Sequence, residues 1–169
     1  MTKLFEEYRE FIPDFESFLE SLRTPLPNHL RINCLKTSPA AVIPMLEEKG
    51  IFLKPTPAGD DTLYEAPRDL LPGKLLEYFL GYLHPQALTS CLASLVLAPK
   101  ANSSVLDLCA APGGKTSHMA QLMENSGVIV ANELHLRRHA PLTYTLSRLG
   151  VLNSVLTAYA AQEFPLRGS

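Results

Sequence analysis

The sequence predicts an α/β protein in which the first half of a doubly wound, Rossmann-like sheet follows a small α+β domain. Three short and uniformly apolar segments, at 105–108, 127–131 and 155–159, alternate with helical stretches. Strands of this kind are buried on both faces and pair in parallel. A turn of small residues directly after the first segment leads into a helix. Ahead of these elements, residues 29–36 alternate apolar and polar side chains, which is typical of a half-buried strand.

The first 24 residues are predicted to form an N-terminal helical segment. Apolar side chains recur at three- and four-residue steps between Leu4 and Leu22, which is the spacing of one helix face. We expect a helix over residues 3–23 that Pro13 breaks or bends, and two prolines after residue 24 end it.

The strand at 29–36 opens the small α+β domain and orients its side chains alternately. Leu30, Ile32 and Cys34 point one way, and Arg31 and Asn33 point the other way. The apolar set is expected to face the core, and the polar set is expected to face solvent.

A helix and two more strands complete the small domain, which we place at residues 25–69. Ser38 supplies a capping hydroxyl directly before a proline, which marks a helix start, and the helix stops at Gly50. Short strands are predicted at 51–53 and 62–64, on either side of a proline-containing loop.

The sheet domain is predicted to occupy residues 70–169. A short helix at 75–81 and a longer apolar helix at 85–97 precede its first strand. Helices at 117–124 and 141–149 then separate the first, second and third strands. Strands that alternate with helices in this way form parallel sheets.

Composition excludes some classes of protein. The 169 residues carry a net charge of −2 and are 46% hydrophobic, which are ordinary values for a globular chain. No apolar run reaches the roughly 20 residues of a membrane span, and the N-terminus has no signal-peptide pattern, so we expect a cytoplasmic protein without membrane contact. The widely spaced Cys34, Cys91 and Cys109 fit neither a disulfide framework nor a metal site.

Charge gives only a weak indication of the partner. The near-neutral total argues against nucleic acid, because proteins that bind it usually carry a basic footprint. Residues 23–36 and 134–158, however, each contain three Lys or Arg residues and no acid. Solvated helix faces have the same composition, so both interpretations stay open.

The turn at 109–116 carries the clearest chemical signal. Backbone N–H groups at the start of a helix favour a bound anion or carboxylate. Gly113 and Gly114 let the backbone approach a ligand closely. Glu133 ends the second strand, 20 residues after Gly113, where a dinucleotide-type fold places an acid that accepts hydrogen bonds from ribose hydroxyls. Together these features predict a nucleoside pocket.

Two classes of nucleoside fit this turn, and so does a plain strand–turn–helix without a ligand. A phosphate-binding loop would use Gly114, Lys115 and Thr116. Cys109, however, replaces the first glycine of such a loop, and Pro112 removes one of its N–H donors. S-adenosylmethionine (SAM) carries no phosphate and therefore needs fewer donors.

Residues 105–116 read Val-Leu-Asp-Leu-Cys-Ala-Ala-Pro-Gly-Gly-Lys-Thr. This segment closely resembles the SAM-binding motif of the Nop/Sun family of RNA cytosine-5 methyltransferases, in particular its bacterial ribosomal-RNA type. Three further stretches resemble the family in the same order: Arg-Ile-Asn-Cys-Leu-Lys at 31–36, the lead into the methyltransferase domain at 81–86, and Asn-Glu at 132–133. The resemblance spans about 25–165.

The resemblance implies the N-terminal portion of a SAM-dependent enzyme that methylates carbon five of cytosine in RNA, with ribosomal RNA as the first candidate substrate and transfer RNA as the second. Glu133 matches the family's ribose-binding acid. Arg31 and Lys36 are then candidate contacts to the RNA backbone from the small domain, although a solvated strand face would look the same. The implied cofactor-binding residues are Cys109, Ala110, Ala111, Pro112, Gly113, Gly114, Lys115 and Glu133.

The resemblance also implies covalent catalysis, in which a cysteine thiolate attacks carbon six of cytosine and a second cysteine helps to release the product. In the family both cysteines follow the fourth and fifth strands, and no cysteine of this chain matches them. Cys34 and Cys91 are interpreted as core residues, Cys109 as part of the turn, and His84 as structural. We therefore assign no catalytic residue and expect no methyl transfer by this chain alone.

Ala160 departs from the family pattern. It stands where the family usually has an Asp near the adenine of SAM, and the loss of one hydrogen-bond acceptor weakens binding by about 1 kcal/mol. Glu163 could compensate only if the alignment is shifted. This departure favours one alternative function, a non-catalytic RNA-binding module with a vestigial SAM fold. The other alternative is a P-loop-like nucleotide-binding protein.

The expected strand order has a consequence for association. In the family the order runs 3-2-1 and continues to strand 4 on the other side of strand 1. The strand at 105–108 would therefore be an uncovered apolar edge in this chain. Because such edges pair with other chains, we predict self-association through it.

Overall fold

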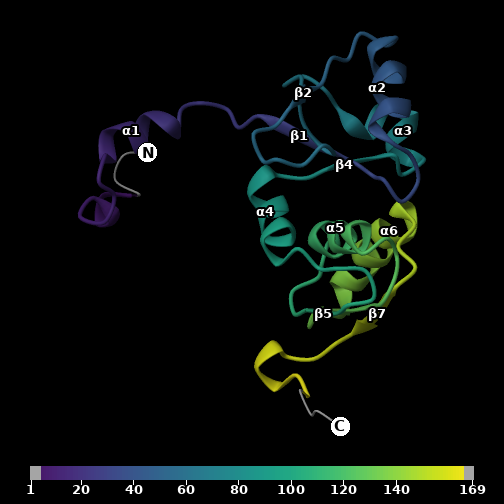
Figure 1. The fold of residues 1–169 in the computed structure, drawn as a ribbon. Coiled ribbons are helices and arrows are strands. Elements are labelled where there is room, and N and C mark those ends of the chain that lie inside the picture. The colour runs from purple at the N-terminus through teal and green to yellow at the C-terminus, as the bar shows by residue number, and fades with distance from the viewer. Residues whose placement is uncertain (1–4, 166–169) are drawn as a thin grey trace.

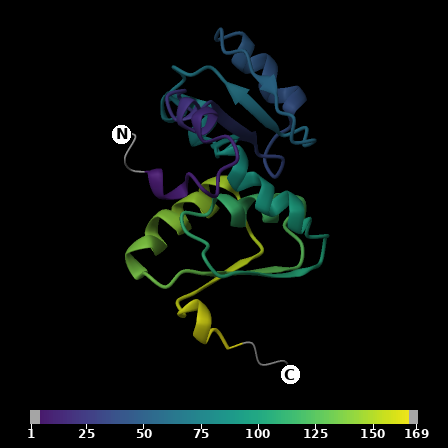
Figure 2. The same cartoon turned by 90° about the vertical axis from the view of Figure 1, so that its left-hand side faces the viewer.

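The computed structural model describes residues 5–165 and contains two sheets (Figure 1). An antiparallel sheet has the order β2-β3-β1-β4, and a parallel sheet has the order β5-β6-β7. The predicted class, an α/β chain with part of a Rossmann-like sheet, is confirmed. Helices α5 and α6 lie between the two sheets in both views (Figures 1 and 2).

The N-terminal segment contains one short α-helix, α1 (Phe15–Ser21), after a 3-10 turn at Glu6–Tyr8. The Asp14 side chain caps α1 by accepting a hydrogen bond from the Ser17 N–H at 3.0 Å. The helix predicted over 3–23 is thus α-helical only in its second half, and its first two residues lie outside the described range. Figure 1 shows α1 standing apart from both sheets.

The antiparallel sheet holds the first core. Its central strand β1 pairs with β3 on one side and β4 on the other. Helix α2 begins after Ser38, whose hydroxyl accepts from the Ala41 N–H as predicted, and it packs on the sheet through Val42 and Leu46. The elements are β1 (Asn28–Ile32), α2 (Pro39–Glu47), β2 (Lys54–Pro55), β3 (Leu63–Ala66) and β4 (Leu83–Pro85).

In this part of the chain one strand prediction was wrong and one strand was missed. Residues 51–53 form no strand, because Ile51 and Leu53 pack against the core and the pairing with β3 starts only at Lys54. Strand β4 was not predicted at all, since three residues are too few to show an alternation and Pro85 looked like a helix start. Because β4 completes the first sheet from beyond residue 69, the division at residues 24 and 69 stays a proposal.

The parallel sheet is built as the sequence predicts. Among the described strands, the order places β5 at one edge, next to β6 alone. Successive right-handed crossovers in one direction put α5 and α6 on the same face of the sheet, and Figure 2 shows this face turned toward the antiparallel sheet. The elements are β5 (Ser104–Asp107), α5 (Gly114–Leu122), β6 (Val128–Asn132), α6 (His139–Leu149) and β7 (Ser154–Thr157).

The connecting helices are short. Helix α3 (Leu76–Phe79) stops before Gly81, as predicted, and α4 (Leu88–Leu97) leads into β5. Further 3-10 turns lie at Pro72–Lys74, Leu136–Arg138 and Ala161–Glu163. Across residues 5–165, no helix combines the length and the apolar content that a membrane crossing requires.

The two halves meet in a seam of buried polar groups. Gly81 has a φ of +78°, and a Cβ there would lie 2.0 Å from the carbonyl oxygen of Arg148 in α6. Asn33 donates from Nδ2 to the carbonyls of Gly81 and Leu149, both at 2.8 Å. The Arg148 guanidinium lies 4.0 Å above the Tyr78 ring. We call these contacts, together with those of β1 on α5, the seam.

The structure overturns three residue-level predictions. Asn33 was expected to face solvent, but it is fully buried in the seam. Arg31 was expected to face solvent and RNA, but its exposed fraction is 0% because α5 covers that side of β1. Cys34 was expected in the core, but β1 ends at Ile32, the alternation stops, and Cys34 is exposed. Cys91 is buried, as predicted. Lys36 is exposed, and its contact with RNA stays a prediction.

Candidate cofactor-binding site

The side chain of Asp107 organises the turn that follows β5. One carboxylate oxygen accepts a hydrogen bond from the Cys109 N–H at 3.2 Å, and the other accepts from the Thr116 hydroxyl at 2.7 Å. The end of the strand is therefore tied to both sides of the turn and to the first turn of α5. This anchor was not singled out from the sequence.

Gly113 is required by the packing of the turn against α6. Its φ is +105°, and a Cβ there would lie 3.2 Å from side-chain atoms of Leu142 and Thr145. Any other residue would be strained and crowded. Gly114 has ordinary space, since a Cβ would lie 3.5 Å from His84. The Ala111–Pro112 peptide bond is cis.

The turn presents N–H groups from the start of a nine-residue helix. The N–H of Gly113 donates back to the carbonyl of Ala110 at 2.7 Å. The first-turn N–H groups of Gly114, Lys115 and Thr116 have no acceptor within the helix. Ala110 and Ala111 are buried, whereas Cys109, Pro112 and Lys115 are exposed. A carboxylate placed before this turn would find both donors and the positive end of the helix dipole.

Glu133 lies at the carboxyl end of β6 with only 3% of its surface exposed. One carboxylate oxygen accepts from the His135 N–H at 2.9 Å, and the other forms an ion pair with Arg138 Nη1 at 2.8 Å. Arg138 Nη2 also donates to the carbonyl of Ala111 at 2.8 Å. The same guanidinium therefore joins the predicted acid to the predicted turn.

Each oxygen of the Glu133 carboxylate can accept a second hydrogen bond. The arrangement thus leaves capacity for ribose hydroxyls while holding the carboxylate in one orientation. Arg138 was noticed in the sequence only as part of a basic stretch. A salt bridge across five positions in an irregular turn has no sequence signature, because it depends on the path of the chain after β6.

Asn132 fixes the ends of all three parallel strands. Its Oδ1 accepts from the Thr157 hydroxyl and the Tyr159 N–H, each at 2.9 Å. Its Nδ2 donates to the carbonyls of Tyr159 at 2.9 Å and Leu108 at 3.3 Å. The residue before Glu133 therefore holds the edge at which the cofactor would bind. The sequence showed Asn132 only as part of a motif match.

Ala160 lies at the end of the third strand's extension and starts the turn Ala161–Glu163. Glu163 in that turn is exposed. Its N–H donates to the carbonyl of Ala160 at 2.9 Å. The predicted loss of an acceptor for the adenine stays a prediction.

The thiols and the potential metal ligands add no further chemistry to this site. Burial raises the pKa of Cys91 to about 11, so its thiol stays protonated at neutral pH. Among residues 5–165, no group of three or more His, Cys, Asp or Glu side chains is placed to hold a metal ion. His84 lies in the seam, where its Nδ1 accepts from Arg148 at 3.1 Å.

Comparisons with known proteins point to the same chemistry. Residues 94–167 match the family profile described as 16S rRNA methyltransferase RsmB/F. The tRNA (cytosine(49)-C(5))-methyltransferase of Pyrococcus abyssi is 40% identical over 156 residues, which cover 92% of this chain and 50% of that protein. The human 28S rRNA (cytosine(4447)-C(5))-methyltransferase is 37% identical over 155 residues, which cover 91% of this chain and 19% of that protein.

Over most of its length the chain is similar to RNA cytosine-C5 methyltransferases. The resemblance noted from residues 105–116 is confirmed over most of the chain. The crystal structure of a methyltransferase homolog protein from Pyrococcus horikoshii is 33% identical, with a TM-score of 0.82 over 88% of this chain and 49% of that one. The chain thus spans about half of each of these archaeal relatives and about a fifth of the human protein.

Proposed function

We propose that this chain is part of an RNA cytosine-C5 methyltransferase, that it binds SAM at the turn 109–116 and Glu133, and that it serves the methylation of carbon five of cytosine in RNA. The observation that carries the proposal is the double contact of Arg138, which joins Glu133 to the carbonyl of Ala111. It brings a ribose acceptor and a set of helix N–H donors to one edge of the sheet. The relatives named above act on ribosomal RNA and on transfer RNA, and we propose ribosomal RNA first.

The residues of the site have separable roles. The first-turn N–H groups of α5 would hold the carboxylate of the methionine part, and Glu133 would accept hydrogen bonds from the ribose. Gly113 keeps that turn against α6. SAM, when bound, supplies an electrophilic methyl group. No side chain of this chain is assigned to the attack on cytosine, so we propose that the chain alone transfers no methyl group.

Charge near the site supports RNA as the partner, and we propose a cytoplasmic location separately. Lys115, Arg137 and Arg138 are exposed around the turn, where they could contact phosphates. A cleft of about 860 Å³ at the C-terminal end of α5 is lined by acids that include Asp60, Asp61 and Glu124. That cleft would repel phosphates, so we place RNA on the side of the turn.

A titration of amide chemical shifts tests the cofactor assignment. The chain is titrated with S-adenosylhomocysteine and separately with Mg-ATP, while the amides of Gly113 and Gly114 are followed by NMR. Shifts with S-adenosylhomocysteine alone are expected. Shifts with Mg-ATP alone would replace the proposal with a P-loop-like nucleotide-binding function, although none of the relatives named above is such a protein.

Ala160 favours a second candidate function, a non-catalytic RNA-binding module. If the chain bound RNA but no S-adenosylhomocysteine in the same titration, and Ala160→Asp restored cofactor binding, this second function would replace the first. Binding of S-adenosylhomocysteine by the unaltered chain would exclude it.

We also propose that the chain self-associates through the free edge of β5. Within residues 5–165 strand β5 pairs only with β6, and α4, which precedes β5 in the chain, exposes Leu92, Val96 and Leu97. Light scattering is expected to show a dimer or larger species. Val96→Lys should weaken it, whereas Leu152→Lys, at an equally exposed position near β7, should not (both side chains are 84% exposed). A monodisperse monomer would refute the proposal.

A further inference from the structure

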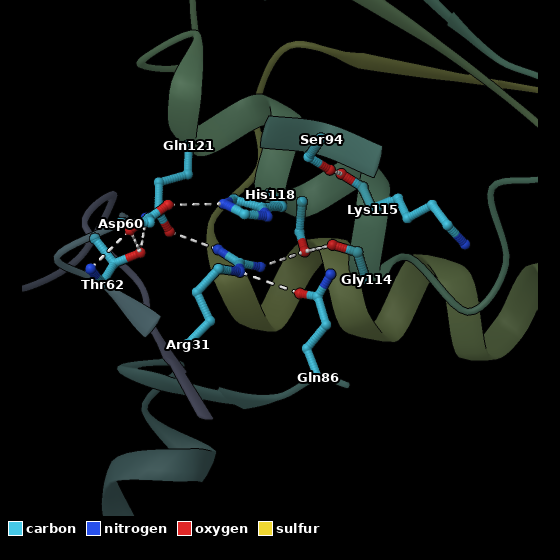
Figure 3. Close-up of polar contacts among 10 residues, drawn as sticks. Arg31, Asp60, Thr62, Gln86, Ser94, Gly114, Lys115, His118 and Gln121 are labelled. Atoms are coloured by element: carbon cyan, nitrogen blue, oxygen red, sulfur yellow. Dashed lines mark hydrogen bonds and ion pairs between the residues drawn. The ribbon is translucent and has the colours of Figure 1, made fainter. Parts of the chain in front are cut away.

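The side chain of Arg31 is fully buried where β1 faces α5 (Figure 3). Its Nε donates to the Gln86 side-chain oxygen at 3.2 Å, and its Nη1 and Nη2 donate to Gln121 and to the Ser117 hydroxyl. All three acceptors are neutral. Burial lowers the pKa of Arg31 to about 10, so the guanidinium is still charged at neutral pH. The seam therefore encloses a cation that has no hydrogen-bonded carboxylate.

Ser117 passes the contact from Arg31 to the cofactor turn. Its hydroxyl accepts from Arg31 Nη2 at 2.8 Å and donates to the carbonyl of Gly114 at 3.0 Å. A hydroxyl has one proton, and the guanidinium can only donate. Arg31 therefore fixes the direction in which the Ser117 hydroxyl points its proton, which is toward the first residue of α5.

Other side chains support the same turn of α5 from outside the parallel sheet. The Ser94 hydroxyl of α4 donates to the carbonyl of Lys115 at 3.3 Å. The Gln86 side chain lies against Gly114, where a Cβ would be 3.6 Å from the amide carbon. Figure 3 shows these side chains converging on the start of α5, with the Lys115 side chain directed away. The carbonyl side of the turn is thus held by protein, and its N–H side is left for a ligand.

We propose that Arg31 is a positioning residue of the cofactor site, acting through Ser117 on the Gly114 carbonyl to aim the first N–H groups of α5. The inference rests on the proposed function. A buried guanidinium with neutral partners costs stability compared with an apolar side chain of the same volume. Its contribution here is the geometry of the turn. Strand β1 then belongs to the cofactor site rather than to an RNA surface.

Two matched substitutions test this role. Ser117→Ala and Gln121→Met each remove one acceptor of Arg31, but only Ser117 contacts the cofactor turn. Affinity for S-adenosylhomocysteine is measured by calorimetry on the full chain, and folding is checked by circular dichroism. Ser117→Ala is expected to weaken binding about fivefold to tenfold. Gln121→Met should stay within about twofold, and Ser117→Thr, which keeps the hydroxyl, should restore most of the affinity.

The amide chemical shifts of the ligand-free protein give a second measurement, which a general loss of stability would not change. The amides of residues 113–116 should shift in Ser117→Ala and not in Gln121→Met. Equal losses of affinity in both variants, or unmoved amides in Ser117→Ala, would overturn the positioning role while leaving the cofactor site in place. An unaltered chain that bound no S-adenosylhomocysteine would overturn the proposed function, and the inference with it.

Discussion

Arg138 shows how one exposed side chain can decide the shape of a buried site. Glu133 is almost fully buried, and a buried carboxylate is tolerated only when it is paired and hydrogen-bonded. Arg138 supplies the ion pair, and the His135 N–H supplies the second partner. Because Arg138 also reaches the carbonyl of Ala111, the pairing that neutralises Glu133 also sets its distance from the turn.

Arg138→Met is therefore expected to lower both stability and affinity for S-adenosylhomocysteine. A buried carboxylate that loses one partner costs about 1–3 kcal/mol, which corresponds to a fall in melting temperature of roughly 2–4 °C per kcal/mol for a chain of this size. Arg137→Met is the matched control, because Arg137 is the exposed neighbour and surface changes usually stay within about 0.5 kcal/mol. Equal effects of the two changes on melting and on calorimetric affinity would contradict this account.

The sequence revealed the residues whose type is fixed by local backbone geometry. Gly113 and Glu133 stand at set distances from a strand end, so they were named as candidates before the fold was known. Arg31 and Arg138 were not assigned their contacts, because an arginine looks the same in sequence whether it meets solvent, a carboxylate or three neutral acceptors. Asn132 was overlooked for the same reason. What these side chains do depends on elements that lie far away in the sequence.

At the level of elements, Gly81 lets the end of α3 press against the end of α6. The carbonyl of Arg148 occupies the space that a Cβ on Gly81 would need. Neither helix could approach this closely with a larger residue. The packing of α3 against α6 therefore sets the distance between β4 and the half of the molecule that contains the parallel sheet.

Gly81→Ala should be far more damaging than Gly59→Ala. Both glycines have a positive φ, +78° and +71°, so both substitutions carry the backbone strain of about 1 kcal/mol. Only at Gly81 does the new Cβ collide with backbone, at 2.0 Å from the Arg148 oxygen, whereas nothing lies within 4 Å at Gly59. Urea unfolding should show that Gly81→Ala loses at least about 2 kcal/mol more of the free energy of unfolding than Gly59→Ala does. Similar losses of unfolding free energy in the two variants would mean that Gly81 and Arg148 can move apart at little cost in free energy.

Elements with a strong apolar pattern were predictable, and those defined by pairing were not. The three parallel strands were found because each is short, apolar and bounded by turn residues. Strands β2 and β4 have two and three residues, and their extended conformation comes from hydrogen bonds to β3 and β1. The local conformational preferences of Lys54–Pro55 and Leu83–Pro85 do not indicate that pairing.

For the whole molecule, the seam makes stability depend on pH. His84 lies between Arg148 and Arg31, and burial together with these positive charges lowers the pKa of His84 to about 3, from an ordinary value of 6.5. The folded protein therefore resists protonation of His84, whereas the unfolded chain accepts the proton below pH 6.5. Stability is complete above pH 6.5 and declines as the pH falls toward 3. His118 of α5 lies beside Asp60, and burial lowers its pKa, so it acts in the same direction.

His84→Gln should flatten this dependence. The Gln side chain keeps an acceptor for Arg148 but does not titrate. Between pH 6.5 and pH 5 the unaltered chain should lose about 1–2 kcal/mol more of its free energy of unfolding than the variant, since each pH unit is worth at most about 1.4 kcal/mol. Urea unfolding at the two pH values measures the difference. Parallel losses in both proteins would show that His84 is not the titrating group.

The hydrogen bond from Arg31 to Ser117 joins residues 86 positions apart, and the hydrogen bond from Asn33 to Leu149 joins residues 116 positions apart. During synthesis, β1 is made before α5 and α6, which supply hydrogen-bond acceptors for Arg31 and Asn33. The antiparallel sheet must then expose Arg31 and Asn33 to water until the second half folds onto it. A graft of residues 28–85 onto an unrelated methyltransferase sheet would carry these two groups into an interface without acceptors. The small sheet is thus a poor candidate for recombination as an independent module, and the two halves are expected to be inherited together.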